Sequence, residues 1–315
     1  NRMRVLLSRA LAPVARVSRP APSSLAARSP HPAPRADPAR RSGRPFRASP
    51  GPAASSTGAM QVHQFPCLSD NYAFLLHDPA TGATAVVDTP EVAPIEAALR
   101  ETGWKLTHIL NTHWHADHTG GNAELKARHG CVVVGPRGER KGADAIPGVD
   151  VSVGQDDIVN IGSIEAKVLD VPGHTAGHVA YHFATHSKVF VGDTLFAMGC
   201  GRLFEGDAAT MWRSIQKIMA LPRDTAVYCA HEYTLANARF AVTVDPENEA
   251  LRKRLLETER ARDAGTPTVP TTVGLELETN PFCRPASLGI RALLGMAGAT
   301  DAEVFAETRR RKDAF

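Results

Sequence analysis

The 315-residue sequence has few of the features that mark membrane-spanning or disulfide-stabilised proteins. No run of apolar residues approaches the ~20 that a transmembrane helix needs, so we expect no integral membrane protein. The five cysteines stand singly along the chain, with no close pair. A disulfide framework is therefore not expected, and a reducing compartment is the default.

Acidic residues are nearly absent from the first 59 positions. This segment holds 11 arginines, no lysine and one carboxylate, Asp37, for a net charge of +10, which leaves −7 for residues 60–315 out of the total of +3. Because the body of the chain is acidic, we expect no general electrostatic attraction to nucleic acid.

Residues 1–59 are rich in Arg, Ala, Ser and Pro, a composition typical of organellar transit peptides. So many prolines prevent a packed core, and we expect a disordered leader. Met3–Arg19 can form a short basic amphipathic helix, which favours the mitochondrion over the chloroplast. Two alternatives stay open. The segment could be an inert tail, or an untranslated leader before a start at Met60, which would leave the protein in the cytoplasm.

After Met60 the pattern becomes that of a folded α/β protein with two sheets. Strand-like runs occur at 61–65, 72–77, 84–88, 107–111, 131–134, 158–161, 164–171, 179–183, 189–191 and 226–230. Helices are expected over 92–99, from 119, and over 208–221, 247–262, 285–294 and 301–311. Because strand signals vanish from Thr234 onward, we place a boundary near 235. It divides a mixed α/β domain (60–234) from a helical domain (235–315).

Four potential metal ligands lie within six residues: His113, His115, Asp117 and His118. Imidazole and carboxylate donors suit zinc or iron. Side chains two apart on a strand share a face, so we expect His113 and His115 to point into one site. A turn into the helix expected from Thr119 would direct Asp117 and His118 toward a neighbouring site.

Three further potential ligands each follow a strand-like run: His174, Asp193 and His231. Loops at strand ends are where functional groups usually project from a rigid scaffold. Any one of these residues alone would be more typical of a core histidine or a helix-capping aspartate. Together with the first four they make seven ligands, which suits two metal ions that share one carboxylate.

This combined pattern resembles the metallo-β-lactamase superfamily, whose hallmark is His-X-His-X-Asp-His followed by a later His, Asp and His. Within it the sequence is most similar to the hydroxyacylglutathione hydrolases, or glyoxalase II, over residues 60–315. The segments that carry the resemblance are Leu68-Ser69-Asp70-Asn71-Tyr72, Thr112 to Asn122, Gly192-Asp193-Thr194-Leu195-Phe196, Gly199-Cys200-Gly201-Arg202, Cys229-Ala230-His231-Glu232-Tyr233, Asn280-Pro281-Phe282 and Arg309-Arg310-Arg311-Lys312-Asp313. The resemblance implies an αββα sandwich of the metallo-β-lactamase type with a C-terminal helical, substrate-binding domain.

The resemblance also implies a role for each matching residue. The first metal ion would be held by His113, His115 and His174, the second by Asp117, His118 and His231, and both by Asp193. The glutathione moiety would be bound by Arg202, Phe204, Tyr233, Arg309 and Lys312. Some family members have tyrosine in place of Phe204, so a hydroxyl contact would be missing here, while the ring can still pack on the ligand. Arg309 and Lys312 are also what a solvated helix end would carry.

The implied reaction is hydrolysis of S-D-lactoylglutathione, an S-2-hydroxyacylglutathione, to D-lactate and glutathione, the second step of methylglyoxal detoxification. A hydroxide bridging two divalent metal ions would attack the thioester, supported by Asp193 and Asp117. Zinc is the expected metal, and iron or manganese also suit these ligands. The sequence has no Gly-X-Ser-X-Gly elbow and no cysteine in the context of a catalytic nucleophile, so water should attack. We expect a small-molecule partner and a monomer.

Two other interpretations stay open. A mononuclear-iron glutathione persulfide dioxygenase of the same superfamily would use one metal ion, leave His118 and His231 idle, and not need the helical tail. A missing ligand would favour a non-catalytic metal-binding or interaction protein, yet all seven ligands are present. The hydrolase is therefore the preferred interpretation.

Overall fold

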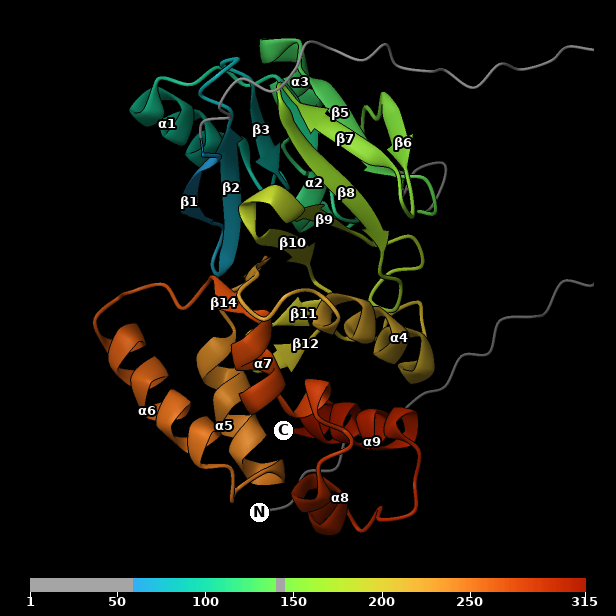
Figure 1. The fold of residues 1–315 in the computed structure, drawn as a ribbon. Helices are drawn as coiled ribbons and strands as arrows, with labels where there is room; N and C mark the ends of the chain where they lie inside the picture. Colours follow the sequence, from blue (N-terminus) through green and yellow to red (C-terminus); the bar gives the residue numbers. More distant parts are fainter. Residues whose placement is uncertain (1–58, 140–144) are drawn as a thin grey trace, which may run out of the picture. The chain divides into compact units, whose positions relative to one another are not determined.

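Two six-stranded β-sheets form the centre of the protein in the computed structural model, which describes residues 59–139 and 145–315 (Figure 1). The first sheet has the order β1-β2-β3-β4-β5-β6, antiparallel from β1 to β3 and parallel from β3 to β6. Its strands are β1 (Gln61–Cys67), β2 (Asn71–His77), β3 (Thr84–Val87), β4 (His108–Leu110), β5 (Val132–Pro136) and β6 (Val151–Val153). Apart from its last residue, the leader expected at 1–59 lies outside the described residues.

The second sheet has the order β14-β13-β10-β9-β8-β7. Its strands are β7 (Ile158–Ile161), β8 (Ile164–Asp170), β9 (Val179–Phe183), β10 (Lys188–Gly192), β13 (Ala226–Cys229) and β14 (Thr271–Thr272). A small hairpin, β11 (Leu195–Phe196) with β12 (Gly199–Cys200), follows β10. The chain therefore returns to the second sheet after leaving it for this hairpin.

Strand β2 shows why the sheets stack as they do, because both of its faces are apolar. Phe74 and Leu76 point into the main core between the sheets, where Phe74 meets Phe190 of β10 edge to face with ring centroids 5.3 Å apart. Leu75, on the opposite face, belongs to a second core that includes Ile95 of helix α1 (Val92–Thr102). The alternation of side chains along a strand thus buries one set against the other sheet and one set against helices.

Helices complete the four layers. Helix α3 (Asn122–His129) adds Leu125 to the core outside the first sheet, and α4 (Ala208–Met219) adds Ile215 and Ile218 to the main core. The predicted αββα sandwich with a helical C-terminal region is confirmed. The remaining short helices are α2 (Ala116–Thr119), η2 (Ala184–His186) and η3 (Pro281–Cys283).

The C-terminal region consists mainly of α5 (Thr234–Val244), α6 (Glu249–Asp263), α7 (Val273–Thr279), α8 (Leu288–Leu294) and α9 (Asp301–Ala314) (Figure 1). Helix α9 begins with a capping box, in which Thr300 and Glu303 satisfy each other's backbone N–H groups. Helix α9 buries Val304 and Phe305, and it packs against α4. The last helix therefore packs against a helix that lies before the predicted boundary.

Several elements differ from the sequence predictions. The lack of strand signals after Thr234 did not mean a lack of strands, because β14 pairs antiparallel with β13 and takes the second sheet across the predicted boundary near 235. That strand has two residues, too few to give an alternating pattern. Strands β6, β11 and β12 and helices α5 and α7 were likewise not predicted. The domain boundary itself stays a prediction.

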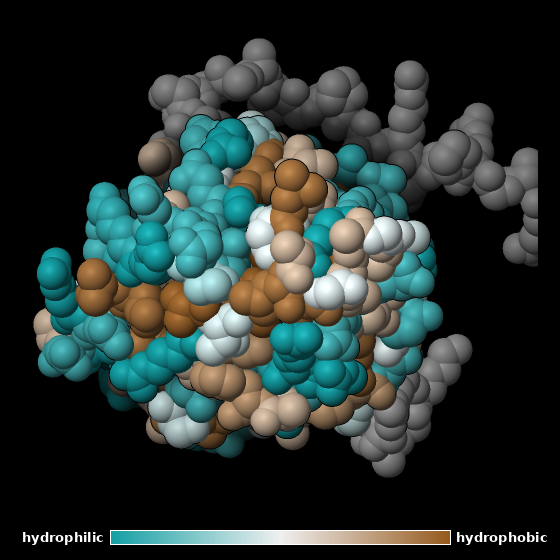
Figure 2. Space-filling model, turned by 90° about the horizontal axis from the view of Figure 1, so that it is seen from below, coloured by the Kyte–Doolittle hydropathy of each residue, from teal (hydrophilic) through white to brown (hydrophobic). Residues whose placement is uncertain are grey.

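Viewed from below, the protein shows a band of hydrophobic residues between hydrophilic ones (Figure 2). The large apolar side chains exposed in the C-terminal region are Tyr233, Leu256, Leu275, Leu288, Leu293 and Phe315. Among the described residues, no helix is both long and apolar enough to span a membrane.

Candidate functional site

Five of the seven candidate ligands lie in segments that follow strands, and the other two, Asp117 and His118, lie in the short helix α2. The sequence analysis placed His113 and His115 on one face of a strand. Strand β4 ends at Leu110, however, and both histidines lie in the loop that follows it. Asp117 and His118 lie in α2, and the next helix begins at Asn122 instead of Thr119. His174, Asp193 and His231 follow β8, β10 and β13, as expected. The loop still brings the two histidines together, although they do not share a face of a strand as predicted.

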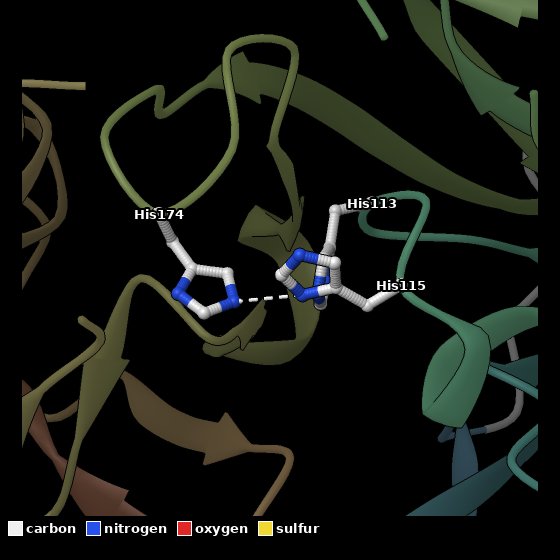
Figure 3. Close-up of side chains that lie close together, drawn as sticks. All are labelled: His113, His115 and His174. Carbon is white, nitrogen blue, oxygen red and sulfur yellow. Dashed lines mark hydrogen bonds between the residues drawn. The ribbon is translucent and has the colours of Figure 1, made fainter. Parts of the chain in front are cut away.

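Three imidazoles form the first group of ligands. His115 Nδ1 lies 3.1 Å from His113 Nε2 and 3.0 Å from His174 Nε2. Figure 3 shows His174 approaching the other two rings from a separate loop. Burial, followed by the neighbouring imidazoles of His118 and His178, lowers the pKa of His113 well below its ordinary value. The neutral imidazole is the form that binds a metal ion.

The second group consists of Asp117, His118 and His231. Asp117 Oδ2 lies 3.4 Å from His118 Nε2 and 3.5 Å from His231 Nε2. The ligand atoms of these three residues all lie within 4.8 Å of one another. They supply two imidazole nitrogens and one carboxylate, a donor set that suits zinc and related divalent ions.

Asp193 lies between the two groups. Its Oδ2 is 3.4 Å from His174 Nε2, whereas its Oδ1 is 3.4 Å from His231 Nε2 and 3.5 Å from His118 Nε2. Both His118 Nε2 and Asp193 Oδ1 are buried without a hydrogen-bond partner. Buried polar atoms are normally satisfied, so these two atoms fit a cation held between them.

The carboxylates around His118 favour a positive charge at this position, which a bound metal ion would supply in place of a proton. Burial opposes a charge on His118, but the carboxylates of Asp193 and Asp88 outweigh it and raise its pKa well above the ordinary value. Burial would also raise the pKa of Asp193, but the imidazoles of His118 and His231 lower it below the usual range. The site therefore holds Asp193 as a carboxylate.

Outer hydrogen bonds orient the rings and come from residues that the sequence analysis did not identify. His118 Nδ1 donates to Asp88 Oδ2 (2.8 Å), and Asp88 also accepts hydrogen bonds from the backbone and hydroxyl of Thr112. His178 Nε2 accepts from the Asp193 backbone N–H (3.1 Å), and its ring stacks on His113. Such partners fix which ring nitrogen faces the centre. Asp88 follows a strand, the same signal that marked His174 and Asp193.

The ligand groups open into a cavity of about 750 Å³. All five predicted substrate-binding residues line it, namely Arg202, Phe204, Tyr233, Arg309 and Lys312. They come from the segment after β12, from the start of α5 and from α9. The cavity is thus lined by candidate metal ligands together with basic and aromatic side chains.

Of the four basic residues of α9, Arg309 and Lys312 are not part of a solvated helix end. The side chain of Arg309 is buried, and it donates to the Cys200 carbonyl (2.9 Å) and pairs with Asp313 (2.8 Å). Lys312 Nζ donates to the Ala236 carbonyl (3.2 Å). Burial, followed by the charges of Arg309 and Arg202, lowers the pKa of Lys312. An anionic ligand near these cations would be favoured because it relieves their mutual repulsion.

Two aromatic residues of the cavity lie beside the imidazole rings of the candidate metal ligands. Phe204 is 62% exposed, with its ring centroid 5.6 Å from that of His115 and 5.2 Å from that of His174. Tyr233 stacks on His231 with centroids 4.7 Å apart. Both rings can therefore pack on a ligand that approaches the metal-binding side chains.

No cysteine is suited to be the nucleophile. All five cysteines are buried and unpaired. Cys200 lines the cavity, but burial raises the pKa of its thiol to about 11, which disfavours the reactive thiolate. Bound water remains the nucleophile that this arrangement favours.

Comparison with known proteins agrees with this geometry. Residues 70–231 match the family model for the metallo-beta-lactamase superfamily, and residues 232–315 match that for the hydroxyacylglutathione hydrolase C-terminus. The hydroxyacylglutathione hydrolase of Methylococcus capsulatus is 55% identical over 256 residues, 81% of this chain and 99% of the relative. That of Rhizobium meliloti is 55% identical over 257 residues, 82% of this chain and 99% of the relative.

Among solved structures, ETHE1 from Myxococcus xanthus is 26% identical with a TM-score of 0.56, covering 80% of this chain and 90% of that one. The two family models, together with 55% identity to a relative that is matched over nearly its whole length, decide the assignment. The chain belongs to the hydroxyacylglutathione hydrolase family, within the metallo-β-lactamase superfamily.

Proposed function

We propose that this protein hydrolyses S-D-lactoylglutathione to D-lactate and glutathione with two divalent metal ions. The observation that carries the proposal is the position of Asp193, whose two carboxylate oxygens face separate groups of ligands at one cavity. His113, His115 and His174 would hold one ion, and Asp117, His118 and His231 the other, with Asp193 shared. Two such ions supply Lewis-acid polarisation of the thioester carbonyl and an activated water.

The protein side chains have separate tasks in this reaction. Asp193 and Asp117 would supply the negative charge that balances the metal ions, while His115 and His174 would supply neutral imidazole ligands. The oxygen of water becomes bonded to the acyl carbon, and the C–S bond breaks to release the glutathione thiolate. Of the two protons of the water, one ends on this thiolate and the other is released to solvent, which leaves D-lactate as the carboxylate. Because that thiol has a pKa of ~8.5, its departure needs no strong general acid.

Arg202 and Lys312 would bind the glutathione moiety. Both line the cavity, and each is a donor for a carboxylate or a peptide carbonyl. Arg309 would contribute charge more than direct contact, since its guanidinium already binds the Cys200 carbonyl and Asp313. Phe204 and Tyr233 would pack against the peptide.

The persulfide dioxygenase alternative is less well supported. A one-metal enzyme would leave His118 and His231 idle, yet these two residues complete a second ligand group. The C-terminal helical region, which that enzyme would not need, matches the hydroxyacylglutathione hydrolase C-terminus.

The test combines metal analysis with a thioester assay. Purified protein should carry close to two metal ions per chain and release free thiol from S-D-lactoylglutathione. Asp193→Ala, which removes the shared carboxylate, should lose most turnover and weaken binding of the second ion. Protein that holds two ions but leaves this thioester intact would refute the proposal, and a fully active Asp193→Ala variant would refute the role of the bridge.

Three finer expectations remain part of this proposal: zinc as the metal, a monomer, and an organellar address in residues 1–59. The two relatives described above are bacterial, so they lend the address no support. A fluorescent protein fused to residues 1–59 should enter an organelle. A cytosolic fusion would favour an inert tail or a start at Met60.

A further inference from the structure

The turn between β1 and β2 and the first residue of β2 hydrogen-bond to two members of the second ligand group, His231 and Asp117. Asp70 Oδ1 accepts a hydrogen bond from His231 Nδ1 (2.8 Å). The side-chain amide of Asn71 donates to the backbone carbonyl and to Oδ2 of Asp117, both at 3.2 Å. Asp70, the last residue of the turn, and Asn71, the first residue of β2, therefore each bind a different candidate metal ligand.

Backbone hydrogen bonds hold this turn against the segment that contains His231. The Tyr72 N–H donates to the Ala230 carbonyl (2.7 Å), and the Glu232 N–H donates to the Asp70 carbonyl (2.9 Å). The Tyr72 hydroxyl also donates to the Glu232 carboxylate (2.8 Å). Asp70 and Asn71 are thus placed by main-chain contacts on both sides and not by their own side chains.

These contacts dictate how the two ligands face the centre. With Nδ1 of His231 donating to Asp70, the lone pair of Nε2 points toward Asp117 and Asp193, 3.5 and 3.4 Å away. The Asn71 amide restricts rotation of the Asp117 carboxylate, because it binds the same oxygen that faces His231. A carboxylate behind a histidine also makes the imidazole a stronger ligand.

The first ligand group depends on different partners. His113 Nδ1 contacts the Thr112 hydroxyl (3.0 Å), and His174 Nδ1 donates to the Arg202 carbonyl (2.9 Å). We propose that Asp70 and Asn71 are positioning residues that orient His231 and Asp117, so that the β1–β2 turn sets the metal affinity of the second site and not of the first. This inference rests on the proposed function for the assignment of the seven ligands.

The experiment titrates the full, metal-stripped chain with Co²⁺, whose visible absorption and paramagnetic proton NMR report on each site. Wild-type protein should bind two equivalents. Asp70→Ala should weaken the second equivalent about 10- to 100-fold and leave the first unchanged, as is typical when the outer partner of a metal ligand is lost. One shifted, exchangeable imidazole N–H resonance should also disappear, because His231 Nδ1–H would exchange freely with water.

Two milder variants guard against misfolding. Asp70→Asn has nearly the same shape and keeps an acceptor for His231 without the charge, so its loss of affinity should be smaller than that of Asp70→Ala. Asn71→Ala should weaken the second equivalent but keep the N–H resonance, since it acts on Asp117.

A matched control separates this role from other contacts of Asp70. Ser69→Ala removes the hydrogen bond from Ser69 Oγ to the other carboxylate oxygen. This variant should bind Co²⁺ like the wild type.

The possible failures are distinguishable. Equal weakening of both equivalents, or unchanged binding in Asp70→Ala, would overturn the positioning role while leaving the two-metal centre in place. A wild-type chain that binds fewer than two equivalents would overturn the proposed centre, and this inference with it.

Discussion

Replacing Glu276 should destabilise the protein and disturb the substrate side of the cavity. Glu276 of α7 is completely buried and pairs with Arg254 of α6 (2.6 Å). Its other oxygen accepts hydrogen bonds from the Met198 backbone N–H (2.8 Å) and the Asn280 amide (2.9 Å). Met198 has a φ of 55°, in the left-handed region that non-glycine residues rarely adopt. Glu276 thus holds the turn of the β11–β12 hairpin.

Glu276→Ala would leave the buried guanidinium of Arg254 without a counter-charge. Breaking a buried ion pair on one side destabilises a protein by about 3–5 kcal/mol. At about 2–4 °C per kcal/mol for a chain of this size, 4 kcal/mol corresponds to a Tm lower by about 8–16 °C. The hairpin lies between Asp193 and Arg202, so KM for the glutathione thioester should rise as well.

A double variant separates the ion pair from the hydrogen bonds. Arg254→Met with Glu276→Leu removes both charges and leaves the Met198 N–H without its acceptor, which should cost about 1–3 kcal/mol. Thermal unfolding by circular dichroism, at equal metal content, measures both proteins. A loss below 1 kcal/mol in Glu276→Ala, or a double variant as unstable as the single one, would refute this reasoning.

Three further predictions concern the site and its surroundings. Arg202→Ala and Lys312→Ala should each lower kcat/KM on the glutathione thioester roughly ten- to a hundredfold, because a charged hydrogen bond is worth ~1.5–3 kcal/mol; an equal loss on a thioester without the peptide would contradict a role in glutathione binding. Gly201→Ala should lower metal content measured by mass spectrometry, since its Cβ would lie 1.9 Å from the Asp193 carbonyl oxygen, and a normal content would argue against this clash. Burial raises the pKa of Glu139 from 4.5 to about 7, so the folded state retains a proton that the unfolded chain has released. The stability of the wild type relative to Glu139→Gln should therefore fall as pH rises from about 4.5 to 7, and thermal unfolding that gives a constant difference would contradict the raised pKa.

The seven candidate ligands could be proposed from the sequence because each of them has a signal along the chain. His113, His115, Asp117 and His118 are close in sequence, and His174 follows a recognisable strand. The strand argument for His113 and His115 was nevertheless wrong, since β4 ends at Leu110 and a loop brings the two rings together. Residue types and spacing predicted the donors, but not the backbone that carries them.

The supporting residues gave no such signal. Asp70 is 161 positions from His231, and Glu276 is 78 positions from Met198. An aspartate in a turn or a glutamate in a helix is an ordinary surface residue by sequence, and burial and partner become known only when the chain is folded. The short strand β14 was missed for a related reason, because two residues carry no periodicity.

The sequence by itself determined the family, the candidate donor residues and most of the strands of the α/β part, since these depend on residue types and local spacing. Only the tertiary structure decided that Asp193 faces two ligand groups, that Arg309 is buried against Cys200, and that the β1–β2 turn lies behind His231. The physical reason is that a hydrogen bond needs its donor and acceptor atoms about 3 Å apart, and a metal site needs its ligand atoms similarly close to one another. Segments far apart in the sequence reach such distances only through the packing of the two sheets and the C-terminal helices.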